Sequence, residues 1–68
     1  MVEYPIWLQS NQEPVACKEK IKILNENHAE LQQMMQDTFE DAMIMGVDEQ
    51  EMRNILKKIV DQLRSPVV

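Results

Sequence analysis

Two residues have side chains that often take part in chemistry, Cys17 and His28, and each residue type occurs only once. A nucleophilic cysteine needs a base and an orienting group close by. On one helix, the eleven residues from Cys17 to His28 correspond to roughly 16 Å. The Glu-x-x-His spacing of di-metal helical bundles is absent, because position 25 is Asn. We therefore expect no catalytic, metal or cofactor site, and a redox or metal-binding module built on Cys17 and His28 is the least favoured interpretation.

The acidic cluster formed by Asp37, Glu40 and Asp41 has a simple interpretation as a solvated or partner-facing surface. On a helix these carboxylates splay around the axis, and the alternating ligands and central glycine of an EF-hand loop are missing. A net charge of −5 disfavours nucleic acid, which requires a basic face. Helices that lie on membranes are also rich in Lys and Arg. The sequence thus predicts a protein that is not an enzyme and binds neither nucleic acid nor membrane.

A length of 68 residues corresponds to one small domain. Apolar residues make up 44% of the chain and charged residues 28%, which favours a folded over a disordered protein. A lone cysteine excludes an intrachain disulfide. No apolar run approaches the 18 or so residues of a membrane span, and the start lacks the basic segment of a signal peptide. These features lead us to expect a cytoplasmic location.

A long helix over residues 14–45 is predicted by an unbroken heptad pattern. Its positions recur at alternating spacings of four and three residues: Cys17, Ile21, Leu24, His28, Leu31, Met35, Thr38, Ala42 and Met45. Pro14 suits the first helical position. The weak helix formers at residues 25–28 leave open a break there, which would give a three-helix bundle. The heptad phase runs through them and favours the continuous helix.

A short helix over residues 48–64 is predicted to follow at once. Gly46 can end the first helix in the left-handed conformation, and Asp48 with Glu51 forms an N-terminal capping pair. So short a connection makes the two helices antiparallel. The predicted fold is an all-α helical hairpin at residues 14–64, with a short tail at 65–68. Five residues are expected to be buried: Leu24, Leu31, Ile55, Leu56 and Ile59.

The lengths and charges of these helices predict a homodimer. The first helix would be roughly 48 Å long and the second about 24 Å, so the second covers only part of the first. Three lysines near the start of the first helix (18, 20 and 22) and the acidic cluster near its end oppose the helix dipole. Two copies packed antiparallel would pair the opposite clusters and form a four-helix bundle. Its seam is expected at Cys17, Ile21, Leu24, His28, Leu31 and Met35.

The first 13 residues are predicted to form an extended aromatic arm. Its apolar side chains gain free energy by leaving water, either in the groove over Ile21 and Leu24 or in a partner protein. Phe39 and Met43 add apolar surface near the turn. The candidate partner-binding residues are therefore Tyr4, Ile6, Trp7, Leu8, Phe39 and Met43.

These patterns favour a small non-enzymatic protein–protein interaction module that binds a second copy of itself and another protein. An assembly factor, an accessory subunit and a regulatory adaptor all fit this description. The alternative is an antitoxin-like or transcription-regulatory helical dimer, which would need a basic surface that this chain does not supply alone.

Overall fold

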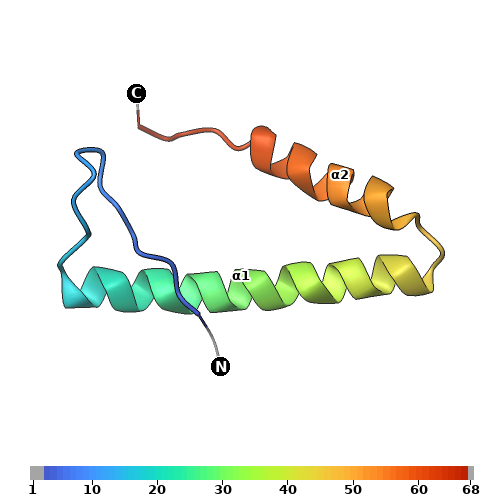
Figure 1. The fold of residues 1–68 in the computed structure, drawn as a ribbon, viewed down its shortest axis with the longest axis horizontal. Coiled ribbons are helices and arrows are strands. Elements are labelled where there is room, and N and C mark those ends of the chain that lie inside the picture. Colours follow the sequence, from blue (N-terminus) through green and yellow to red (C-terminus); the bar gives the residue numbers. More distant parts are fainter. Residues whose placement is uncertain (1–2, 68) are drawn as a thin grey trace. The chain divides into compact units, whose positions relative to one another are not determined.

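The computed structural model describes residues 3–67. In this part of the chain there are two α-helices, α1 (Lys18–Ile44) and α2 (Glu49–Asp61), and no strand (Figure 1). The predicted all-α fold class is confirmed. The chain divides into two compact units, one ending at Met35 and the other beginning at Gln36. The parts of the predicted arm and tail that fall on residues 1, 2 and 68 lie outside the described residues.

Helix α1 begins at Lys18, four residues later than predicted. The physical reason lies in the backbone of the preceding segment. Pro14 forms an isolated antiparallel bridge with Leu8, and the Val15 N–H donates to the Trp7 carbonyl over 2.7 Å. These contacts hold residues 14 and 15 in a conformation that cannot start a helix.

The arm before α1 folds back on itself through a loop at residues 9–13. The Gln9 N–H donates to the Glu13 carbonyl at 2.8 Å, and Gln12 has a φ of 70°. The loop reverses the chain so that its two sides can pair. The non-helical segment consequently extends to Cys17, whose carbonyl accepts the first helical hydrogen bond from Ile21 at 3.0 Å.

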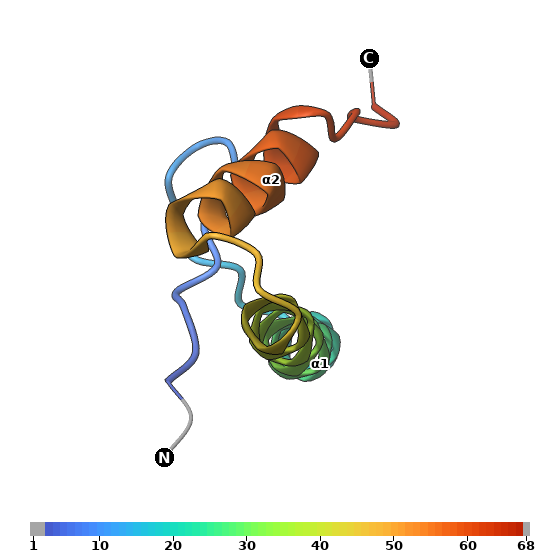
Figure 2. The same cartoon turned by 90° about the vertical axis from the view of Figure 1, so that its right-hand side faces the viewer.

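Residues 25–28 are helical, so α1 is continuous and the three-helix alternative is wrong. Figure 2 looks along α1 and shows one uninterrupted coil. An asparagine side chain weakens a helix when it competes for backbone hydrogen bonds. The Asn25 side chain instead accepts a hydrogen bond from Trp7 Nε1 at 2.8 Å. Its amide oxygen is therefore engaged by the arm, outside the α1 backbone.

Gly46 ends α1 in a Schellman motif, as the sequence predicted. Its φ is 90°, in the left-handed region that glycine adopts without a Cβ penalty. The Gly46 N–H donates to Met43 at 3.1 Å and the Val47 N–H to Ala42 at 2.9 Å. These two bonds satisfy carbonyls that the last turn of a helix leaves without partners.

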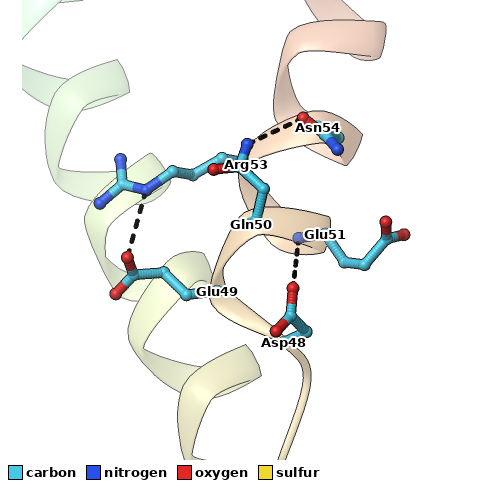
Figure 3. Close-up of polar contacts among 6 residues, drawn as sticks. All are labelled: Asp48, Glu49, Gln50, Glu51, Arg53 and Asn54. Atoms are coloured by element: carbon cyan, nitrogen blue, oxygen red, sulfur yellow. Dashed lines mark hydrogen bonds and ion pairs between the residues drawn. The ribbon is translucent and has the colours of Figure 1, made fainter.

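Asp48 starts α2 by accepting a hydrogen bond from the Glu51 N–H at 3.0 Å (Figure 3). The Glu51 carboxylate points away from Asp48 in the same view, so the capping is one-sided. Within α2, Glu49 and Arg53 form an ion pair at 3.8 Å, and the Gln50 side-chain amide donates to Asn54 Oδ1 at 3.0 Å. The helix ends at Asp61, three residues short of the predicted boundary at 64.

Few side chains are buried in the single chain. Met52, with 8% of its surface exposed, is the one buried hydrophobic residue among residues 3–67. Of the five residues expected in the core, Leu24 and Leu56 are half-buried. The other three are largely exposed, at 57%, 47% and 54% for Leu31, Ile55 and Ile59. Two helices without a third layer cover only one face of each other.

Replacing Gly46 by valine should lower the free energy of unfolding by roughly 1 kcal/mol or more. A Cβ at this position would meet no atom within 4 Å, so the loss comes from backbone strain alone. Gly46→Asn is the matched control, because asparagine tolerates the left-handed region and should lose less. Urea unfolding followed by circular dichroism measures both. Equal losses in the two variants would contradict the strain argument.

Candidate functional site

The arm attaches to α1 through an aromatic cluster of Tyr4, Trp7 and His28. The Trp7 ring meets His28 edge-on, with ring centroids 5.9 Å apart and an interplanar angle of 80°. Tyr4 makes a similar contact at 6.3 Å and 68°. Edge-to-face pairs contribute about 0.5–1.5 kcal/mol beyond the area that they bury. With the bond from Trp7 to Asn25, the cluster fixes the arm across α1 (Figure 1).

The arm therefore packs on its own chain. Trp7 is half-buried, and so are Ile21 and Leu24 on α1. The remaining apolar side chains of the arm stay open to solvent, at 48%, 78% and 53% exposure for Tyr4, Ile6 and Leu8. The sequence left open whether the arm docks on α1 or in a partner protein; in the single chain, Trp7 docks on α1.

His28 packs against the aromatic rings of the arm. Its Nδ1 is buried without a hydrogen-bond partner in the described part of the chain. A buried unpaired nitrogen costs free energy, and the contacts with Tyr4 and Trp7 offset that cost. Among residues 3–67, no three His, Cys, Asp or Glu side chains are grouped so that they could hold a metal ion.

Cys17 is an exposed thiol at the start of α1. The backbone N–H of Lys20 is the main cause that lowers the pKa of this thiol; desolvation opposes it, and the backbone of Glu19 and the charge of Lys20 lower the pKa further. A helix N-terminus favours a thiolate for the same reason. Roughly 16 Å of helix still separates Cys17 from His28, so the two do not form a nucleophile–base pair.

The six predicted seam residues fall into two groups in the single chain. Ile21, Leu24 and His28 are half-buried in the unit that contains the arm. Leu31 is 57% exposed, Met35 is 36% exposed, and Cys17 is also exposed. The arm and α1 thus bring the first three together and leave the other three open.

The second unit contains a contact that sequence reasoning missed. The Arg53 guanidinium lies over the Phe39 ring, 4.9 Å from its centroid, which is a cation–π geometry. The heptad pattern gave no signal for it, because Arg53 reads as part of a solvated face. Phe39 and Met43 are both half-buried, so these two candidate partner-binding residues are partly used within the chain.

An apolar row on α2 is progressively uncovered with distance from the turn. Met52 is 8% exposed, but the exposed fraction is 47% at Ile55, 54% at Ile59 and 74% at Leu63. Ile55 and Ile59 are four residues apart on one side of α2, and Leu63 follows two residues beyond the end of the helix at Asp61. We call Ile55, Ile59 and Leu63 the α2 row.

Comparisons with protein families, curated proteins and solved structures gave no significant match to this chain. In the described residues, neither helix is long and apolar enough to cross a membrane. The function is therefore argued from the chain's own surfaces.

Removing the bond between the arm and α1 should destabilise the chain by about 1 kcal/mol. Trp7→Phe keeps the aromatic ring but loses the donor, and Asn25→Ala loses the acceptor. Because both variants break the same bond, the double variant should lose less than the sum of the two. Urea unfolding gives the three free energies. Ile6→Ala, at an exposed position of the same arm, should be neutral, and additive losses would contradict the contact.

The rate at which the Cys17 thiol is alkylated should reach half of its maximum at a lower pH in the folded chain than in urea, because its pKa is lowered in the folded state. By linkage, ionised Cys17 stabilises the fold above its unfolded pKa, and this contribution is lost as pH falls through the folded pKa. Lys20→Gln should retain most of the difference, since the backbone N–H of residue 20 is the first cause. Rates of iodoacetamide labelling against pH measure the effect, and identical folded and unfolded profiles would contradict it.

Proposed function

We propose that this chain is a small non-enzymatic protein–protein interaction module, acting as an assembly factor, an accessory subunit or a regulatory adaptor. Its working parts are exposed apolar faces on two helices joined by a turn that Gly46 and Asp48 define. Two hairpins pair in a four-helix bundle, and the α2 row contacts another protein.

The observation that carries this proposal is the rise in exposure along the α2 row, from 47% at Ile55 to 74% at Leu63. Fully burying one such side chain is worth about 1.5–3 kcal/mol. Amphipathic helices recognise partners through apolar anchors at spacings of three and four residues. Ile55 and Ile59 have this spacing on a helix whose start is fixed by Asp48, and Leu63 follows just beyond the end of that helix.

The turn and the Arg53–Phe39 contact support the same proposal. They fix the beginning of α2 against the later part of α1 without using the α2 row. A recognition surface on a preorganised helix costs less ordering entropy on binding than one on a flexible segment. The chain thus holds its apolar anchors in place before a partner arrives.

Replacing Ile59 and Leu63 together by glutamine should abolish partner binding while leaving the helices folded, because both side chains are more than half exposed. The measurement is co-purification from a native extract with tagged wild-type and variant chains, after circular dichroism has shown equal helicity. Loss of a specific co-purifying protein is the expected result.

Ile44→Gln is the matched control, since Ile44 is 83% exposed but lies on α1 outside the α2 row. This variant should keep the partner. An unchanged set of co-purifying proteins in the Ile59 and Leu63 variant would contradict the assignment of the α2 row.

A further inference from the structure

A second row of exposed side chains runs along α1, on a face that the arm leaves open. Ile23 is 58% exposed, Leu31 57% and Met34 67%. Asn27 and Thr38, which are also exposed, continue the row with successive spacings of four, four, three and four residues. Such spacings keep side chains on one face of a helix. We call Ile23, Asn27, Leu31, Met34 and Thr38 the α1 stripe.

This stripe differs from the heptad seam expected from the sequence. The side of α1 that receives the arm carries Ile21, Leu24, Asn25 and His28, all half-buried. In the unit that ends at Met35, Ile23 and Met34 lie beside the arm-covered face, whereas the exposed Leu31 and Met35 also belong to the seam. The stripe is narrow, and its apolar members cluster around Leu31, the middle residue of α1.

Opposite charges flank the two ends of the α1 stripe. Lys20 lies three residues before Ile23, and Asp41 lies three residues after Thr38. Helix α1 has no basic residue in its last turn. Each of the two charges therefore stands at the end of the helix where the dipole disfavours it. A partner that brought the opposite charge to each end would relieve both.

We propose that the α1 stripe binds the α1 stripe of a second copy, antiparallel, with a two-fold axis between Glu30 and Leu31. In this register Lys20 faces Asp41 of the second copy, and the symmetry repeats the pair at the other end. Ile23 then faces Thr38, and Asn27 faces Met34. A two-fold interface requires a self-complementary surface, and the stripe with its flanking charges has that property.

The charges select the antiparallel arrangement over the parallel one. Parallel α1 helices would place Lys20 beside Lys20 and Asp41 beside Asp41, and like charges in such positions repel. Glu30 lies near the axis in either arrangement, so its cost does not discriminate between them. A heterologous partner would need its own matching charge pattern, for which this chain offers no indication.

The inference rests on the proposed function, because it assigns one of the exposed helical faces to a stated occupant. The test is a charge-reversal cycle measured by sedimentation equilibrium on the full chain. Lys20→Glu and Asp41→Lys should each weaken dimerisation by roughly tenfold, since two attractive pairs per dimer become repulsive. The double variant Lys20→Glu/Asp41→Lys should recover the wild-type dissociation constant, because the reversed charges again pair.

Two further variants test the stripe and the orientation. Leu31→Gln should give a monomer with unchanged helicity, whereas Ile44→Gln should dimerise as the wild type does. In a Cys17→Ser background, a mixture of the Ile23→Cys and Thr38→Cys chains should form the mixed disulfide in preference to either homodisulfide. Circular dichroism of each variant separates a lost interface from a lost fold.

Several results would overturn the inference. A wild-type chain that stays monomeric at high micromolar concentration would do so, as would a double variant that is no better than the single ones. Preferential Ile23→Cys homodisulfides would show a parallel pair. If the wild-type chain is monomeric but captures a protein that the Ile59 and Leu63 variant loses, the proposed interaction module holds and the dimer is wrong. A monomer that captures no protein would remove both.

Discussion

An α-helix of 27 residues has apolar side chains on more than one face, and a 68-residue chain has little material with which to cover them. Which side chains of α1 stay exposed depends on which of its faces the arm and α2 cover. The arm covers one face of the first part of α1 through Trp7 and His28, and α2 contacts the later part through the Arg53 guanidinium over the Phe39 ring. The α1 stripe and the α2 row are among the faces that remain exposed. Because burying apolar surface is the main favourable term in both folding and association, these faces are the natural places for partners.

The parts of the fold that depend on local chemistry could be predicted from the sequence. Gly46 and Asp48 act through their own backbone and the next few residues, so the position of the turn and the Asp48 cap were predictable, although Glu51 does not return the capping bond. The continuity of α1 was also predictable, because the heptad phase runs through residues 25–28. The start of α1 and the end of α2 were less predictable from the sequence. Helix α1 starts at Lys18 and not at Pro14, because the bridge between Leu8 and Pro14 joins residues whose pairing no short motif announces.

The candidate surfaces were likewise predictable only in part from the sequence. Heptad spacing identified the side of α1 that carries Ile21, Leu24 and His28, but not which element would cover it. That choice depends on the bond from Trp7 to Asn25, which joins residues 18 positions apart. The cation–π contact between Arg53 and Phe39 was missed for a similar reason, since an arginine in a solvated pattern does not reveal the ring beneath it. Because the arm covers the face with Ile21, Leu24 and His28, the exposed apolar side chains of the α1 stripe are Ile23, Leu31 and Met34.

The arm therefore acts in folding, and the charges of α1 act in the proposed association of two chains. Internal docking of Trp7 occupies one side of the helix, and the α1 stripe beside it has only three large apolar side chains. So small a surface supplies limited stabilisation and discriminates poorly between orientations. Charged groups at the edge of an interface contribute little affinity but disfavour wrong pairings. The lysines at the start of α1 and the acidic residues at its end cost the isolated helix some stability. In a pair of such helices the same arrangement distinguishes the antiparallel from the parallel orientation, which the apolar stripe alone cannot do.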